Sequence, residues 1–172
     1  MTTQARIAKF EKVSFGQFAE GWKKVFPKIA DDDIRAVYDA IKLPRRATAA
    51  SAGYDFFLPM DLTLEEGRGA LIPTGIRVKM DPGWVLCCFP RSGLGFKFRM
   101  QLDNTVGVID ADYYGSDNEG HIHTKFTCDA RQDKVIELAA GDAFMQAIFL
   151  PYGLTDDDDV TDVRNGGFGS TD

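Results

Sequence analysis

From residue 47 onward the chain is a succession of short apolar, β-like runs separated by turns, and this pattern limits the fold more than any other feature. Residues 81–83 (Asp-Pro-Gly) and 140–142 (Ala-Gly-Asp) are two of the turns, because Gly and Pro at such points end regular structure. Many short strands at nearly even spacing favour a sandwich, jelly roll or barrel over a parallel α/β sheet. The predicted strands cover residues 54–58, 70–72, 75–80, 84–89, 106–109, 121–128, 134–138 and 143–150.

The N-terminal quarter has a different, helical pattern. Ser14-x-x-Gln17 has the form of a capping box, in which the serine accepts from a helical amide and the glutamine reaches back. Apolar residues that include Phe18 and Trp22 follow at helical spacing, and a second such stripe covers residues 34–41. Two amphipathic helices are therefore expected. The predicted divisions are an N-terminal strand and helical extension (1–43), a β core (44–152) and a flexible C-terminal arm that closes over the site (153–172).

Composition narrows the class of function. The 172 residues carry a net charge of −6, which argues against a basic nucleic-acid-binding face but allows a single nucleotide to be bound. No apolar run is long enough to cross a membrane, and no secretory signal is visible at the start. The three cysteines, two of them adjacent (Cys87 and Cys88), cannot form a full disulfide framework. We therefore expect a cytoplasmic protein.

The C-terminal arm combines residues that suit a nucleotide. Three glycines within residues 166–169 let successive amides turn toward one anion. Arg164 offers a forked cation for phosphate, and Phe168 a flat face for a base. Ser170 and Thr171 add hydroxyl donors. The arm lacks the lysine of a P-loop, and the alternative is a tail of chance composition.

A second candidate is the segment Pro90-Arg-Ser-Gly-Leu-Gly95, directly after an apolar strand. Arg91, Ser92 and Gly93 present a guanidinium, a hydroxyl and an unencumbered amide within one turn, which suits phosphate oxygens. The alternative interpretation is an ordinary surface turn.

Residues 104–113 (Asn-Thr-Val-Gly-Val-Ile-Asp-Ala-Asp-Tyr) are the third candidate. Gly107 within a strand allows a ligand to approach the backbone closely. Asp110 follows apolar residues, where desolvation makes a carboxylate a better base. If the strand continues, Asp112 points to the opposite face, so the two carboxylates are not expected to act as a dyad. Tyr113 either packs against a sugar or belongs to the core.

Two weaker segments each place one polar residue beside a turn. Asp55 follows Gly53 at a strand start, and Gln146 lies in an apolar strand that follows the turn at Gly141. Taken alone, each is better explained as a structural turn.

Together and in this order, the five segments resemble the five motifs of the trimeric dUTP pyrophosphatases (dUTPases), over residues 43–171. The resemblance implies a mainly β, jelly-roll-like (β-clip) subunit. It also implies a homotrimer whose three active sites lie at subunit interfaces. The implied reaction is hydrolysis of dUTP to dUMP and pyrophosphate, assisted by Mg²⁺.

The resemblance also implies roles for single residues. Asp110 matches the aspartate that activates the attacking water, and Tyr113 matches the residue stacked on the deoxyribose. Asp55 matches an acid that reaches Mg²⁺ through water, the ion being held mainly by the phosphates. The implied substrate-binding residues are Arg91, Ser92, Gly93, Asn104, Gly107, Val108, Ile109, Tyr113, Gln146, Arg164, Phe168, Gly169, Ser170 and Thr171.

The chain departs from the family pattern at several points. The arm is one residue shorter between Arg164 and Phe168, and Tyr114 stands where an arginine is usual. Residues 115–121 look like an insertion, and the N-terminal helix pair is an addition. His121 and His123 near Glu119 suggest either a metal site or ordinary strand histidines. Two other functions stay open: a dCTP deaminase-like enzyme, which shares the fold, and a regulatory role that binds a protein partner.

Overall fold

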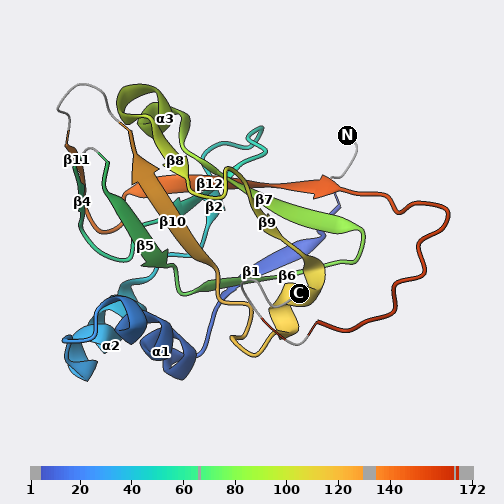
Figure 1. Ribbon diagram of the computed structural model, residues 1–172, viewed down its shortest axis with the longest axis horizontal. Helices are drawn as coiled ribbons and strands as arrows, with labels where there is room; N and C mark the ends of the chain where they lie inside the picture. The colour runs from blue at the N-terminus through green and yellow to red at the C-terminus, as the bar shows by residue number, and fades with distance from the viewer. Residues whose placement is uncertain (1–4, 66, 130–134, 165, 167–172) are drawn as a thin grey trace.

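The computed structural model describes residues 5–65, 67–129, 135–164 and 166. Figure 1 shows a mainly β molecule with two helices packed at one end. The helices are α1 (Phe15–Val25), α2 (Asp31–Ala40), α3 (Ser92–Phe98) and the 3-10 helix η1 (Ala111–Gly115). The strands are β1 (Ala8–Lys12), β2 (Arg45–Arg46), β3 (Tyr54–Phe57), β4 (Leu62–Leu64), β5 (Gly69–Pro73), β6 (Ile76–Met80), β7 (Trp84–Pro90), β8 (Met100–Leu102), β9 (Gly107–Ile109), β10 (His123–Cys128), β11 (Ile136–Leu138) and β12 (Ala143–Pro151).

The largest sheet carries most of the predicted site residues. Its five strands run in the order β2-β3-β12-β7-β9, and every neighbouring pair is antiparallel. The register places Gln146 on β12 between Asp55 on β3 and Phe89 on β7. A three-stranded sheet (β5-β10-β8) and two pairs (β1-β6 and β4-β11) complete the architecture. This is the mainly β architecture that the turn spacing predicts, and it agrees with the jelly-roll-like fold that the family resemblance implies.

The core forms where the sheets face each other. Strand β10 alternates buried and more exposed residues, as a strand with one covered face does. Phe126 on β10 meets Phe144 on β12 edge-to-face, with ring centroids 5.3 Å apart. Both rings are fully buried. This contact joins the three-stranded sheet to the five-stranded one and fixes the frame that holds the site.

The N-terminal helices follow their sequence pattern. The Ser14 hydroxyl accepts from the Gln17 amide at 3.2 Å, as a capping box requires, and α1 begins at the next residue. Phe18, Trp22 and Ile34 are buried, so both predicted apolar stripes face the core. None of the described helices has the length and apolar character needed to span a membrane.

The eight predicted strands are all confirmed, with ends that differ by one or two residues where these are described; residue 134, the expected start of one strand, lies outside the described residues. The expected strand at 121–128 begins only at His123. The N-terminal strand expected within residues 1–43 is β1. Three strands of two or three residues (β2, β4 and β8) and helix α3 were not located by the sequence pattern, because each is too short to show a clear period of its own.

Candidate active site

One group of predicted residues meets at an end of the five-stranded sheet. Here a cavity of about 160 Å³ is lined by Ala47, Ser51, Gly53, Asp55, Arg91, Ser92 and Gln146. The strand order explains why these residues lie together. Strand β12 lies between β3 and β7, so three segments that are distant in sequence come together at this end of the sheet. We call this cavity the Arg91 pocket.

Charge and space in the Arg91 pocket are set by two contacts. Arg91 Nε lies 3.4 Å from Asp55 Oδ1, so the cation and the acid predicted from separate segments are ion-paired. A side chain at Gly53 would place its Cβ 2.9 Å from Gln146 Oε1. Glycine at this position therefore makes room for the Gln146 side chain in the pocket.

The segment after Arg91 is a helix, not the surface turn that was the alternative. Helix α3 begins at Ser92, and Arg91 is its N-cap residue. Arg91, Ser92 and Gly93 also line a second cavity of about 500 Å³ together with Lys97. The side chain of Arg91 is about half exposed and therefore accessible to a ligand from either cavity.

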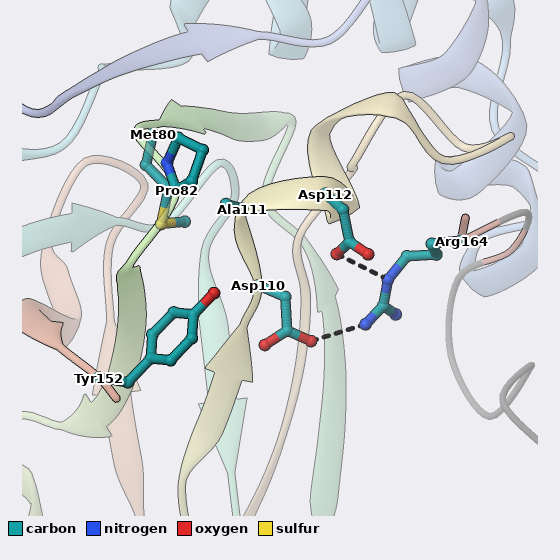
Figure 2. A pocket seen from close by; sticks show the side chains of 7 residues that line it. All are labelled: Met80, Pro82, Asp110, Ala111, Asp112, Tyr152 and Arg164. Atoms are coloured by element: carbon teal, nitrogen blue, oxygen red, sulfur yellow. Dashed lines mark hydrogen bonds and ion pairs between the residues drawn. The ribbon is translucent and has the colours of Figure 1, made fainter. Parts of the chain in front are cut away.

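Asp110 lies in a different cavity, which Figure 2 shows and which we call the Asp110 pocket. Arg164 Nη2 donates to Asp110 Oδ2 at 2.6 Å, and Arg164 Nε donates to Asp112 Oδ1 at 3.0 Å. The cavity measures about 530 Å³ and is lined by Met80, Pro82, Asp110, Ala111, Asp112, Tyr152 and Arg164.

The prediction that Asp112 faces away from Asp110 is wrong. It assumed that the strand continues, but β9 ends at Ile109 and the chain turns into η1 at Ala111. The turn brings both carboxylates to the same guanidinium, that of Arg164 (Figure 2).

The residues implied to read the base lie on and before β9. Val108 is 58% exposed, which is unusual for valine and leaves an apolar surface for a ligand. Asn104 is exposed in the tight turn that precedes β9. A side chain at Gly107 would place its Cβ 3.1 Å from that of Cys88, its pairing partner on β7. Packing against Cys88 is thus one reason for glycine there.

Most of the Tyr113 side chain packs in the core, and the Arg164 guanidinium lies over its ring. It is 7% exposed, and its hydroxyl donates to the His121 carbonyl at 2.9 Å. Asn118 Nδ2 donates to the same hydroxyl at 2.8 Å. Burial raises the pKa of Tyr113. The Arg164 guanidinium lies 5.9 Å from the ring centroid, so the ring borders the Asp110 pocket.

His121 and His123 are part of the packing beside α1. His121 is fully buried, and its Nε2 accepts from the Gly75 amide at 2.9 Å. The two rings lie 4.1 Å apart, and burial lowers the pKa of His121 to about 3. Among the described residues no group of three or more His, Cys, Asp or Glu side chains is placed to hold a metal ion.

The C-terminal segment returns from β12 to the Asp110 pocket. Figure 1 shows it leaving the end of β12 in a wide loop and coming back beside η1. Within the described part of this segment, Arg164 is the last residue whose side chain contacts the site. Phe168, Gly169, Ser170 and Thr171 lie outside the described residues.

Several pocket residues were not among the predicted ones. Ala47 and Ser51 line the Arg91 pocket, and the run of small residues before Gly53 was a signal for them, because small side chains leave space. Pro82 and Tyr152 line the Asp110 pocket. They come from a turn and a strand end with no local motif, so only the fold reveals them.

Comparison with known proteins gives one consistent family. A model of the dUTPase family matches residues 39–172. The deoxyuridine 5'-triphosphate nucleotidohydrolase of Lactococcus lactis is 40% identical over 134 residues, which cover 76% of this chain and 88% of that protein. The enzyme of the same name from Shewanella baltica is 39% identical over 150 residues, or 83% of this chain and 92% of that one.

Solved structures of dUTPases are also similar to this chain. The crystal structure of dUTPase from Streptococcus mutans matches with a TM-score of 0.59 at 39% identity, over 69% of this chain and 91% of that one. A mutant dUTPase from phage phi11 of S. aureus matches with a TM-score of 0.63 at 19% identity, over 91% and 98% of the two chains. The second likeness concerns the fold alone. With the family model covering three-quarters of its length, the chain belongs to the dUTPase family.

Proposed function

We propose that this protein hydrolyses dUTP to dUMP and pyrophosphate. The observation that carries the proposal is the family membership together with Asp110, a carboxylate at a strand end in an open cavity beside the exposed Val108. The relatives from Lactococcus lactis and Shewanella baltica, whose names denote this activity, support it.

In the proposed reaction Asp110 orients a water molecule and takes its proton. The water oxygen attacks the α-phosphorus, the bond from that phosphorus to the bridging oxygen of the β-phosphate breaks, and pyrophosphate leaves with the bond electrons. Positioning of this kind provides most of the acceleration in phosphoryl transfer, since the protein has little covalent chemistry to do. General-base assistance contributes about 10²- to 10⁴-fold.

Selectivity for deoxyuridine is assigned to β9 and its flanks. Asn104, Gly107, Val108 and Ile109 form the base-reading surface in this proposal, and the exposed Val108 supplies its apolar part. Tyr113 lies under the sugar. A ring fixed by hydrogen bonds at its hydroxyl cannot move aside for a 2′-hydroxyl, which would favour deoxyribose.

The triphosphate is assigned to the Arg91 pocket and to the arm. Arg91, Ser92, Gly93 and Gln146 supply donors for the phosphates. In the closed complex Arg164, Phe168, Gly169, Ser170 and Thr171 cover the nucleotide. Phosphate oxygens then compete with Asp110 and Asp112 for the Arg164 guanidinium.

The proposal includes Mg²⁺, and the residues present fit a weakly held ion. Mg²⁺ keeps several waters and binds through one or two carboxylates plus substrate phosphates, and Asp55 is the carboxylate in the Arg91 pocket. When bound, the ion would offset phosphate charge and fix the triphosphate conformation. The ion pair with Arg91 keeps Asp55 aimed into the cavity.

We further propose a homotrimer whose active sites are shared between subunits. The pairing of Leu86 with Ile109 puts Asp110 beside Val85, whereas Arg91 follows the other end of β7. The steps from Val85 to Arg91 span roughly 20 Å at strand geometry. A general base must lie within hydrogen-bond reach of the proton that it takes. Asp110 would therefore act on phosphates held by Arg91 of another subunit.

The decisive experiment measures pyrophosphate release from dUTP, dCTP, dTTP and UTP with Mg²⁺. Rapid turnover of dUTP and at least 100-fold slower turnover of the others is the expected result. Equal turnover of dUTP and dTTP would refute the assignment. Release of ammonia from dCTP would instead identify a dCTP deaminase-like enzyme. We place the activity in the cytoplasm, in keeping with three cysteines that are all free thiols.

A further inference from the structure

The segment that follows Asp110 is tied to the N-terminal strand, which lies outside the part of the chain matched by the family model. Tyr114 on η1 donates its hydroxyl proton to Glu11 Oε2 on β1 at 2.8 Å. Arg77 on β6 stacks on the Tyr114 ring, with its guanidinium carbon 4.5 Å from the ring centroid. Arg77 also lies 3.4 Å from Glu11 Oε2. Strand β1 of the N-terminal extension is thus hydrogen-bonded to η1.

A second connection joins the loop after η1 to the start of α1. Glu119 accepts from the Ser14 amide at 2.7 Å and from the Ser14 hydroxyl at 2.6 Å. It also lies 3.8 Å from Arg77. Arg77 is therefore between Glu11 and Glu119, and all three side chains are at least two-thirds shielded from solvent. Shielding makes such pairs less sensitive to salt than surface pairs.

The backbone of this loop is held in an unusual conformation. Glu119 has φ of 56° and Gly120 has φ of 70°, and a non-glycine residue in this region is strained. At Gly120 a Cβ would lie 2.8 Å from the Tyr113 carbonyl oxygen and from the Tyr114 Cα. The backbone of the loop at Gly120 therefore packs directly against the backbone of η1. Such strain persists where surrounding contacts fix the conformation, and here Glu119 supplies them.

We propose that Glu11, Arg77, Tyr114 and Glu119 form a positioning network through which the N-terminal extension sets the placement of η1 and of Asp110 in front of it. This rests on the proposed function. None of the four residues lines the Asp110 pocket, so their effect is exerted through η1. Because a displacement of about 1 Å can cost about 100-fold in rate, loss of one contact is expected to lower kcat while nucleotide binding is kept.

The test compares Y114F, E11M, which removes the acceptor of the same bond, and the double variant with a matched control, Y38F. Y114F keeps the ring that stacks on Arg77 and removes only the hydrogen bond to Glu11. Y38F removes a hydroxyl hydrogen bond of 2.7 Å, to the Val13 carbonyl, elsewhere in the same extension. For each protein, kcat and KM for dUTP, the Kd of a non-hydrolysable dUTP analogue and Tm are measured.

Y114F and E11M are each expected to lower kcat about fivefold or more, with the analogue Kd within about twofold of the unmodified protein. The double variant should be no slower than E11M, because the bond that Y114F removes is already absent in E11M. Y38F should keep its kcat within about twofold.

Three results would contradict the positioning role and leave the proposed function unaffected. They are an unchanged kcat in Y114F, an equal loss of kcat in Y38F, or a loss of kcat matched by an equal loss of analogue binding. Absence of dUTP turnover by the unmodified protein would instead overturn the proposed function. E11M tests the same bond from its acceptor end, so the inference stays testable if Y114F fails to fold.

Discussion

The guanidinium of Arg164 lies 2.6 Å from the carboxylate of Asp110, although 54 positions separate them in the sequence. The bond joins the C-terminal segment to the proposed general base of the same chain. Because Asp112 shares the guanidinium, the arm is held against the Asp110 pocket by two charge-assisted hydrogen bonds. A substrate phosphate would have to replace these contacts for Arg164 to bind it.

Replacing Arg164 by alanine is expected to lower kcat/KM for dUTP by about 100-fold, the loss of one charged transition-state contact. Stability should change little, since both acids are about half exposed and such ion pairs contribute at most about 1 kcal/mol. Steady-state kinetics and thermal unfolding check this. Lysine at 164 should not restore the rate, because it lacks the fork. Full activity in the alanine variant would contradict the role of Arg164.

Asp110→Asn is expected to reduce kcat by about 10³-fold, because the amide cannot take a proton from water. Binding of a non-hydrolysable dUTP analogue should remain, and calorimetric titration measures it. Asp117→Asn is the matched control, since Asp117 is exposed on the loop after η1 and outside the described pockets. If the Asp110 variant hydrolyses dUTP at the normal rate, another group is the base.

Gly53→Ala is expected to raise KM for dUTP about tenfold while the fold stays intact. The new Cβ would lie 2.9 Å from Gln146 Oε1, so the flexible Gln146 side chain must leave the Arg91 pocket. Loss of one hydrogen bond to a charged phosphate accounts for the size of the effect. Gly16→Ala is the control, because its nearest atom would be 3.9 Å away. An unchanged KM would show that Gln146 does not bind substrate.

Mixing two inactive variants should restore activity if sites are shared. Asp110→Asn and Arg91→Ala are unfolded and refolded together, so that trimers form at random from both chains. About one quarter of the sites then combine an intact Asp110 with an intact Arg91, and about one quarter of the normal turnover is expected. Variants refolded separately are the control. No recovery in mixed trimers would place both groups in one subunit's site.

The free energy of unfolding is expected to fall as the pH drops below about 6.5, partly because of His121. Burial lowers the pKa of His121 from 6.5 to about 3, so the unfolded chain takes up a proton that the folded chain cannot accept. Its contribution is complete above pH 6.5 and is lost as the pH falls toward 3. Between pH 6.5 and 5 the loss is about 2 kcal/mol.

Urea unfolding of the normal protein and of His121→Gln at several pH values isolates the contribution of His121 to the pH dependence of the free energy of unfolding. Glutamine keeps an acceptor for the Gly75 amide but does not titrate. The variant should therefore show a shallower slope by about one proton. Burial also lowers the pKa of His123, so part of the slope should remain. Identical slopes in the two proteins would contradict the buried, neutral state of His121.

The N-terminus of α1 shows which hydrogen bonds a sequence motif can predict. The capping motif correctly predicted the bond from the Gln17 amide to Ser14. It also predicted that Gln17 reaches back to the Ser14 amide, but Glu119 accepts from that amide instead. The first bond depends on neighbours in the chain, whereas the second depends on a loop 105 residues away. Local patterns cannot contain that information.

The candidate site likewise combines features that the sequence predicts with contacts that it cannot predict. The Arg91 segment and the segment that holds Gly107 and Asp110 were each visible as residue types that suit a nucleotide, and the order of all five segments indicated the family. The sequence could not show that Asp55 pairs with Arg91, because that contact depends on β12 lying between β3 and β7. Nor could it show the orientation of Asp112, because a single turn into η1 reverses the side of the strand to which a side chain points.

Sequence alone determined the fold class, the two amphipathic helices and the chemical groups available for a triphosphate. Periodicity and turn residues act over a few positions and are written directly in the chain. Tertiary structure alone decided that Arg91 and Asp110 lie at opposite ends of β7, and that Arg164 bridges Asp110 and Asp112. It also decided that Glu11 accepts from Tyr114 and that Glu119 accepts from Ser14. Those contacts join residues far apart in sequence, so they exist only once the sheets have packed.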